Sequence, residues 1–262
     1  MTILERTTAL QSTNSMLCVG LDSSLEKLPA GIPRTMQGLL EFNRHIIDAT
    51  KDVCSAYKLN FAFYEQYGHK GVQVLEQTVA MLPSTHIRIA DAKRGDIGNT
   101  AEAYARSVFE HMPFDSVTVS PYMGADSVIP FLAYSEKLVF ILALTSNPGS
   151  HDIQRQQVPS GTLYEHVMQT ALQWEGPAEI GFVVGATHAQ ELALVRSRFA
   201  HVPFLIPGVG AQGADPADIR RANAGGPAFV NSSRAILYAS SGSDFAQRAR
   251  QVAQSTAAEL QA

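Results

Sequence analysis

Short apolar segments alternate with amphipathic stretches along nearly the whole chain, and this alternation limits the folds that the chain can adopt. The strand-like segments are Met16–Asp22, Cys54–Leu59, His86–Lys93, Ser116–Pro121, Leu138–Thr145, Ile180–Gly185, Phe204–Pro207 and Ala228–Ser232. The stretches with helical periodicity are Leu39–Thr50, Gly71–Leu82, Ala101–His111, Gly161–Trp174, Ala189–Phe199, Ala217–Ala222 and Asp244–Ala258. Eight strands alternating with helices over about 250 residues predict an α/β protein with a (β/α)₈ TIM barrel. A doubly wound parallel sheet is the structural alternative.

No linker or change in composition suggests a second domain, so we expect a single barrel domain over residues 1–262. Residues 1–15 precede the first expected strand and are predicted to pack on the barrel as an extension, as a helix that covers its base. The polar connection Asn147–Ser160 is unusually long for a barrel loop. It is interpreted as either a lid or a solvated surface loop.

Composition excludes several classes of protein. The net charge of −4, without clustered Lys and Arg, argues against a nucleic-acid surface. The longest apolar run, Leu138–Leu144, is far shorter than the about 20 residues of a membrane-spanning helix. No secretion signal is visible at the N-terminus. The two cysteines, Cys18 and Cys54, are predicted to be buried free thiols in a reducing cytoplasm.

Charged residues stand at the carboxyl ends of the first three expected strands. Side-chain alternation places the following residues on one side of their strands: Asp22, Lys58, Asp91 and Lys93. Each alone is explained by a salt bridge at a strand end. Four of them with matching alternation predict a site, because the carboxyl ends of barrel strands meet at one mouth. Asp96 follows where a helix would begin, and we expect a buried Lys93 held between carboxylates.

A glycine-rich segment, Pro207–Gly213, follows the seventh expected strand. Its Gly208, Gly210 and Gly213 fit G-x-G-x-x-G, the fingerprint of dinucleotide-binding folds. That interpretation is weak, because the fingerprint needs an acidic residue about 20 positions further on, where this chain has Phe229–Ser233. The motif also follows the seventh strand instead of the first.

Loops after strands seven and eight of a barrel commonly bind a phosphate group. Arg234 follows the eighth expected strand and could bind a phosphate with two hydrogen bonds, although a glycine turn beside a solvated arginine is the plain alternative. Ser146 ends the fifth strand with a hydroxyl, which turn chemistry alone would explain. The histidines are scattered, so no metal site is predicted.

The motifs that carry a family resemblance are Lys58, Asp91-x-Lys93-x-x-Asp96, Pro207–Gly213 and Arg234. Together and in this order, they resemble those of the orotidine 5′-phosphate decarboxylases. The resemblance extends over nearly the whole chain, from Asp22 to Arg234. The stretch Tyr57–Glu65 is similar to the bacterial type 2 branch, which includes mycobacterial enzymes.

This resemblance implies a cytoplasmic homodimer that converts orotidine 5′-monophosphate to UMP and CO₂ in pyrimidine biosynthesis, without metal or cofactor. Motif position implies a charged catalytic tetrad formed by Lys58, Asp91, Lys93 and Asp96. It also implies that Asp96 and Thr100 reach into the site of the neighbouring subunit. No contact with nucleic acid or membrane is implied.

The resemblance also implies the contacts with the substrate. Asp22 and Lys58 would contact the ribose hydroxyls, and Ser146 would contact the pyrimidine. The residues expected around the phosphate are Pro207, Gly208, Gly210, Gln212, Gly213, Ser233 and Arg234, with Gln212 bridging base and phosphate. Ser233 stands where many relatives have glycine. Its backbone N–H can still bind phosphate unless the position requires a positive φ.

The expected chemistry needs a fixed positive charge. Loss of CO₂ from C6 of the pyrimidine leaves a carbanion that no cofactor delocalises, and the ammonium group of Lys93 would stabilise it and then protonate C6. Neighbouring carboxylates would keep Lys93 protonated. Two alternatives stay open. One is a Mg²⁺-dependent sugar-phosphate decarboxylase or aldolase of a related barrel family, and the other is a non-catalytic barrel that binds a phosphate ligand.

Overall fold

The protein is described by a computed structural model over residues 2–13, 15–185, 189–208 and 215–261. Its parallel strands are β1 (Leu17–Gly20), β2 (Ala56–Asn60), β3 (Ile87–Arg94), β4 (Ser116–Val119), β5 (Leu138–Leu144), β8 (Glu179–Val184), β9 (Phe204–Pro207) and β10 (Ala228–Ser232). They pair in the closed order β1-β10-β9-β8-β5-β4-β3-β2. The prediction of a (β/α)₈ barrel is therefore confirmed, and the doubly wound alternative is wrong.

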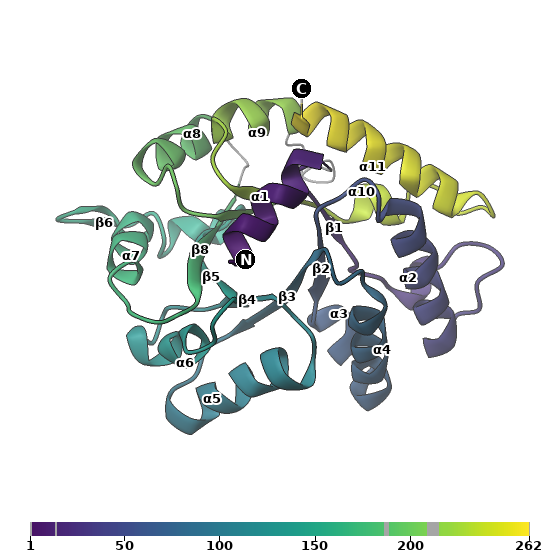
Figure 1. Ribbon diagram of the computed structural model, residues 1–262, viewed down its shortest axis with the longest axis horizontal. Helices are drawn as coiled ribbons and strands as arrows, with labels where there is room; N and C mark the ends of the chain where they lie inside the picture. Colours follow the sequence, from purple (N-terminus) through teal and green to yellow (C-terminus); the bar gives the residue numbers. More distant parts are fainter. Residues whose placement is uncertain (1, 14, 186–188, 209–214, 262) are drawn as a thin grey trace.

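Helices surround the barrel (Figure 1). The longer ones are α2 (Met36–Thr50), α4 (Gly68–Met81), α5 (Gly98–Arg106), α7 (Leu163–Ala171), α8 (Ala189–Arg198), α9 (Pro216–Asn223) and α11 (Phe245–Gln261). The shorter ones are α3 (Ala62–Glu65), α6 (Ile129–Leu132) and α10 (Arg234–Leu237). The expected helix Ala101–His111 is divided, because α5 continues as a π-helical turn over Ser107–His111.

Strand alternation separates two apolar cores. Outward side chains such as Tyr57 and Val117 belong to the large cluster beneath the helices. Inward side chains form a second cluster inside the barrel, where Phe140 and Phe229 meet edge to face with their ring centroids 6.0 Å apart. Each such fully buried aromatic side chain contributes about 1.5–3 kcal/mol through the hydrophobic effect. Gly181 leaves the room for this packing, since a Cβ there would lie 2.8 Å from the Phe140 ring.

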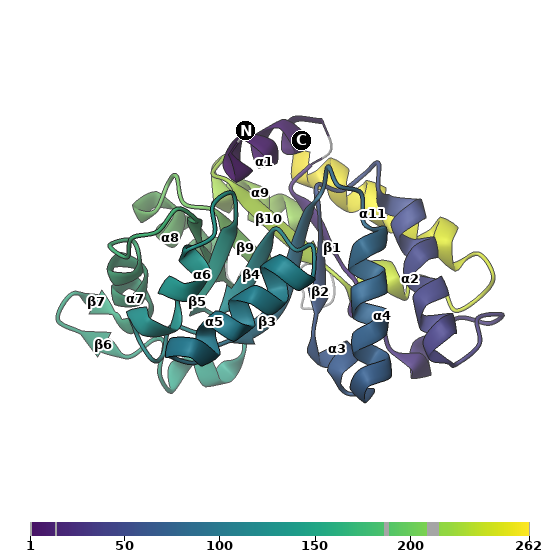
Figure 2. The same ribbon diagram turned by 60° about the horizontal axis from the view of Figure 1, so that its bottom comes forward.

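Helix α1 (Ile3–Thr13) lies across the N-terminal end of the barrel (Figures 1 and 2). Its Ile3 is buried within the inner cluster. Arg6 forms a 2.7 Å ion pair with Asp115, and the side chain of Gln11 donates a hydrogen bond to the Ala228 carbonyl. Because α1 covers this end, the opposite end, where the strands finish, is the one open to a ligand.

The long connection after β5 is folded and tied to its neighbours. Its Gln154 side chain accepts a 2.8 Å hydrogen bond from the Thr145 N–H at the end of β5. Its Arg155 binds both carboxylate oxygens of Glu191 on α8. A short hairpin of β6 (Gln157–Val158) and β7 (Gly161–Thr162) completes the connection and projects at the side of the molecule (Figure 2).

Cys18 and Cys54 are both buried thiols that are not joined in a disulfide, as predicted. Burial raises the pKa of the Cys54 thiol to about 12, so this thiol stays protonated at neutral pH.

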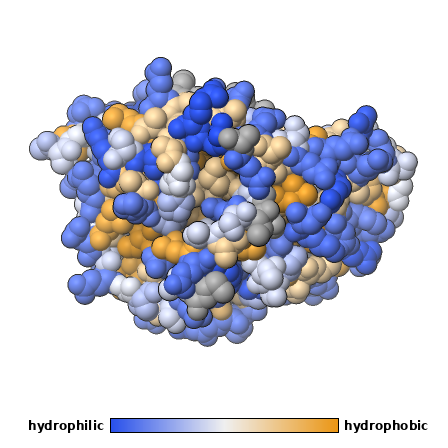
Figure 3. Space-filling view, turned by 45° about the horizontal axis from the view of Figure 1, so that its top comes forward, coloured by the Kyte–Doolittle hydropathy of each residue, from blue (hydrophilic) through white to orange (hydrophobic). Residues whose placement is uncertain are grey.

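On the side of α8, α9 and α11, the surface is largely polar, with apolar side chains in smaller groups between (Figure 3). This pattern is typical of amphipathic helices that bury one side against a sheet. None of the helices in the described part of the chain combines the length and the apolar character needed to cross a membrane.

Candidate active site

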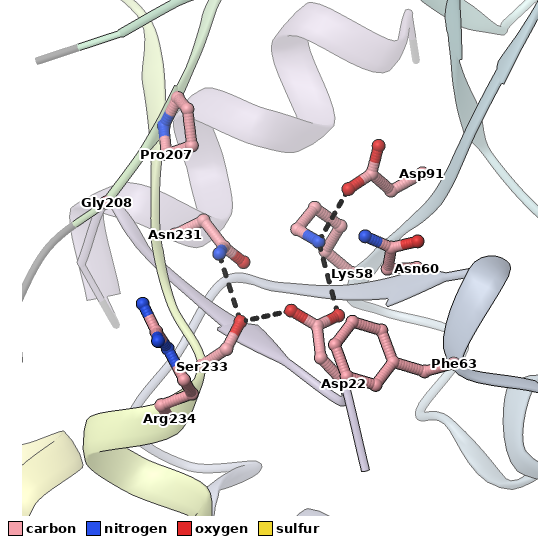
Figure 4. Close-up of a pocket in the computed structure, with 10 residues that line it drawn as sticks. All are labelled: Asp22, Lys58, Asn60, Phe63, Asp91, Pro207, Gly208, Asn231, Ser233 and Arg234. Carbon is pink, nitrogen blue, oxygen red and sulfur yellow. Dashed lines mark hydrogen bonds and ion pairs between the residues drawn. The ribbon is translucent and has the colours of Figure 1, made fainter. Parts of the chain in front are cut away.

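Two adjoining cavities lie at the carboxyl ends of the strands, with volumes of about 290 Å³ and 230 Å³. Lys58, Asp91 and Pro207 line both of them. The first cavity extends toward Asp22, Asn231, Ser233 and Arg234 (Figure 4), and the second extends toward Lys93 and Ser146. The structure therefore brings residues from opposite ends of the sequence to one mouth.

A chain of ion pairs runs through these cavities. The Lys58 ammonium lies 2.8 Å from Asp91 Oδ2 and 3.4 Å from Asp22 Oδ1 (Figure 4). The Lys93 ammonium lies 2.5 Å from Asp91 Oδ1. The expectation of a buried Lys93 between carboxylates is wrong for the single chain. Lys58 is the buried lysine between two carboxylates, whereas the Lys93 side chain is 47% exposed.

The paired charges keep Lys58 and Asp91 ionised. Burial opposes the charged form of Asp91, but the ammonium groups of Lys58 and Lys93 outweigh it and hold the pKa of Asp91 well below its usual range. Burial also opposes the charged form of Lys58, but the carboxylates of Asp22 and Asp91 raise its pKa above the usual value. Lys58 and Asp91 therefore face the cavities as charged groups at neutral pH.

The backbone of Lys93 is unusual. Its φ is +47°, in the left-handed region that residues other than glycine rarely adopt. Here β3 bulges away from β4, because the register shifts between Ala90 and Arg94. The Lys93 N–H donates a 3.0 Å hydrogen bond to the hydroxyl of Thr118 in place of a regular strand partner. Bulges re-aim side chains next to functional sites.

Asp22 is held on its other side by a serine. Ser233 Oγ donates a 2.8 Å hydrogen bond to Asp22 Oδ2 and accepts one from Asn231 Nδ2 at 3.2 Å. Gly20 makes this approach possible, because a Cβ there would lie 1.9 Å from Ser233 Oγ. The φ of Ser233 is −114°, so its position does not require glycine.

The expected phosphate-binding residues fall into two groups. Pro207, Gly208, Ser233 and Arg234 line the first cavity, and the exposed Arg234 extends toward the Gly208 side (Figure 4). Gly208 has a φ of +103°, which favours glycine. In the described part of the chain, the Arg234 guanidinium forms no ion pair, so it is available to an anion. The predictions for Gly210, Gln212 and Gly213 fall outside the described residues.

Two predicted site residues lie elsewhere in the single chain. The Asp96 carboxylate accepts a 2.8 Å hydrogen bond from the N–H of Ile97. Thr100 is exposed on α5. Among the residues described, neither lines the two cavities. Their expected role in a second subunit stays a prediction.

Sequence reasoning missed several residues of the site. Asn60 and Asn231 continue the inward alternation of β2 and β10, so following the pattern further along each strand could have identified them. Thr118 shares the inward side of β4 with Ser116, and this alternation of polar and apolar residues can also be seen in the sequence. Phe63, which also lines the first cavity, follows β2 and had no distinguishing signal.

These features define a (β/α)₈ barrel protein with a charged site that suits a phosphorylated ligand. Over residues 2–13, 15–185, 189–208 and 215–261, no group of three or more His, Cys, Asp or Glu side chains could hold a metal ion.

Known proteins identify the family. A sequence model of the orotidine 5′-phosphate decarboxylase / HUMPS family matches residues 15–249. The orotidine 5′-phosphate decarboxylase of Herpetosiphon aurantiacus is 47% identical over 248 residues, which cover 94% of this chain and 92% of that protein. The chain therefore belongs to the orotidine 5′-phosphate decarboxylase / HUMPS family, and the resemblance seen in the sequence is confirmed.

Solved structures agree with this assignment. The Leishmania donovani OMP decarboxylase superimposes with a TM-score of 0.84 and 34% identity, over 100% of both chains. The Leishmania donovani UMP synthase superimposes with a TM-score of 0.86 and 35% identity. The match covers 98% of this chain but 56% of the synthase, which is a longer protein.

Proposed function

We propose that this protein is a carboxy-lyase that decarboxylates orotidine 5′-monophosphate to UMP and CO₂ in pyrimidine biosynthesis. The observation that carries the proposal is the Lys58–Asp91–Lys93 network at the open end of the barrel. It occurs in a chain that is 47% identical to an orotidine 5′-phosphate decarboxylase over 94% of its length. The first cavity, with Arg234 at one side, suits the phosphorylated ribose, and the second, with Lys93 and Ser146, suits the pyrimidine.

In the proposed mechanism, the phosphate and ribose anchor the substrate so that C6 lies beside Lys93. As the C6–carboxylate bond breaks, its electron pair stays on C6 and CO₂ leaves. The Lys93 ammonium stabilises this developing negative charge and then transfers a proton to C6, which yields UMP. Asp91 orients the Lys93 ammonium through the 2.5 Å ion pair. Asp22 and Lys58 bind the ribose hydroxyls.

Product analysis tests this proposal. Protein treated with EDTA should convert orotidine 5′-monophosphate to UMP and CO₂, with both products quantified by chromatography and gas release. The alternative of a Mg²⁺-dependent sugar-phosphate enzyme predicts no turnover of this nucleotide, and turnover of 3-keto-gulonate phosphate that returns when Mg²⁺ is added. A non-catalytic barrel would bind UMP without turning over either compound. The high identity to a decarboxylase over nearly the full length disfavours both alternatives.

Replacing Arg234 with alanine should raise KM for orotidine 5′-monophosphate, because the variant loses an exposed guanidinium at the cavity edge. Loss of a charge-assisted, bidentate hydrogen bond lowers the binding free energy by about 1.5–3 kcal/mol, which is roughly a 10- to 150-fold increase in KM. Steady-state kinetics measure it, with Arg248→Ala as a matched control on the outer helix α11. An unchanged KM in Arg234→Ala would remove this arginine from the site.

We also infer that the protein is a cytoplasmic homodimer of the bacterial type 2 branch, with one barrel domain per chain and residues 1–15 as an extension on its base. The identity of 47% to the Herpetosiphon aurantiacus protein, against 34% to the Leishmania donovani decarboxylase, supports this branch. The position of Asp96 and Thr100 away from the cavities of their own chain supports a site that a second subunit completes.

Subunit mixing tests the shared site. Lys93→Ala and Asp96→Ala proteins should each be inactive, because each lacks one charged member of every site. After the subunits exchange, a mixed dimer would contain one site with both native residues, so part of the activity should return. Mass spectrometry of the mixture confirms the exchange. Exchange without any return of activity would contradict a contribution of Asp96 from the second subunit.

A further inference from the structure

The hydroxyl of Thr118 lies between the two residues at the centre of the site. Its Oγ1 is 3.0 Å from the Lys93 backbone nitrogen and 3.1 Å from Asp91 Oδ1. The Lys93 N–H can only donate, and an ionised carboxylate can only accept. Thr118 must therefore accept from Lys93 and donate its single hydroxyl hydrogen to Asp91. Both directions follow from the chemistry of the groups.

The position of Thr118 explains why a hydroxyl is needed there. In the register between β3 and β4, Ala90 pairs with Val117 and Arg94 pairs with Val119. Between these pairs, β3 has three residues, 91–93, whereas β4 has only Thr118. The bulge interrupts the regular ladder, so the Lys93 N–H needs a side-chain acceptor. Thr118 is fully buried, so water does not readily replace it.

The two hydrogen bonds connect backbone geometry to charge geometry. One holds Lys93 at its left-handed φ of +47°, a conformation that is strained for this residue type. The other fixes Asp91 Oδ1, the same oxygen that binds the Lys93 ammonium at 2.5 Å. One hydroxyl therefore fixes both the backbone that carries the Lys93 side chain and the carboxylate that binds the Lys93 ammonium.

We propose that Thr118 is a positioning residue that aligns the Lys93 ammonium with the reacting carbon by fixing the Lys93 backbone and the Asp91 carboxylate together. This inference rests on the proposed decarboxylase function. Thr118 itself touches no substrate atom in this account. Its removal should therefore affect the chemical step more than binding, because the groups that hold ribose and phosphate lie on other strands.

Thr118→Val and Thr118→Ser test the proposal. Valine keeps the branched shape without the hydroxyl, and serine keeps the hydroxyl without the methyl group. We expect kcat of Thr118→Val to fall about 10²-fold, the order of loss expected when a catalytic group is misplaced by about 1 Å. We expect the dissociation constant for UMP, measured by calorimetry, to change less than roughly threefold. Thr118→Ser should restore most of kcat.

A matched control separates this role from loss of a buried hydroxyl in general. Thr78 is also fully buried, and its hydroxyl accepts a 3.0 Å hydrogen bond from Asn43 away from the site. Thr78→Val should lower thermal stability without lowering kcat. If Thr118→Val does not fold, Thr118→Ala against Thr118→Ser gives the same comparison of a side chain with and without the hydroxyl.

Equal kcat values for the wild-type protein and Thr118→Val, or for the alanine and serine variants, would overturn the positioning role. So would a serine variant as slow as the valine variant. A wild-type protein that does not turn over orotidine 5′-monophosphate would instead contradict the proposed function. The two failures are thus distinguished by the wild-type rate, which is measured first.

Discussion

Lys93→Ala should abolish the decarboxylation of orotidine 5′-monophosphate while the protein still binds UMP. The variant removes both the positive charge beside C6 and the proton donor. Proton transfer by a positioned group contributes about 10²–10⁴-fold, and charge stabilisation in a preorganised site contributes about 10²–10³-fold. Together they predict a loss of kcat of at least about 10⁴-fold. Assays with long incubation times measure the residual rate of decarboxylation, and calorimetry measures UMP binding.

The structure suggests that this variant will fold. The Lys93 side chain is 47% exposed, so its truncation opens no closed cavity in the core. Alanine adopts the positive φ of this position with about the same strain as lysine, so the lost ion pair with Asp91 is what thermal unfolding will register, as a modest loss of stability. Lys70→Ala, at an exposed position on α4, serves as the control and should keep full activity. Normal turnover by Lys93→Ala would refute the mechanism.

Asp91→Asn should lower both activity and stability, because Asp91 is the carboxylate shared by Lys58 and Lys93. Asparagine keeps the shape but leaves the buried Lys58 with Asp22 alone, at 3.4 Å. Removing one partner of a buried pair destabilises a protein by about 3–5 kcal/mol. We expect kcat to fall by roughly 10³-fold, since Lys93 loses its anchor. Urea unfolding and steady-state kinetics measure the two losses, and wild-type stability or kcat in Asp91→Asn would contradict this role.

The destabilisation by Asp91→Asn should depend on pH in one direction. The pKa of Asp91 is lowered in the folded protein, so its contribution is fully present above the unfolded value of about 3.9. The contribution is lost as the pH falls toward the folded pKa. Lys58 has a raised pKa, so its contribution is present below about 10.4 and is lost as the pH rises further. The stability difference between wild type and variant should stay constant between about pH 5 and pH 9 and shrink in acid. A difference that grew in acid would contradict the ion-pair account.

The fold was predictable because strand alternation repeats. The inward side of β2 carries Ala56 and then Lys58 at the mouth, and the outward side carries Tyr57 and Leu59. This is the pattern of a barrel strand whose inward side becomes polar where it reaches the site. The same rule places Asp22 and Asp91 at the mouth. Regular geometry therefore accounts for the charged residues that the structure brings together.

Irregular geometry accounts for what was not predicted. The bulge in β3 depends on the register with β4, so neither the positive φ of Lys93 nor its bond to Thr118 follows from alternation. The exposure of the Lys93 side chain depends on which groups lie over the mouth of the barrel, and strand alternation does not predict them. Asp96 belongs to the same motif in sequence, but it turns to its own backbone neighbour Ile97.

The most direct test of the account is a single absorbance measurement. Orotidine 5′-monophosphate is added to EDTA-treated protein without any metal or cofactor, and the pyrimidine absorbance is followed with time. The proposed decarboxylation predicts a decrease that proceeds to completion as UMP forms, at a rate proportional to protein concentration. A constant absorbance with folded protein, or a decrease that occurs only after a divalent cation is added, would contradict it.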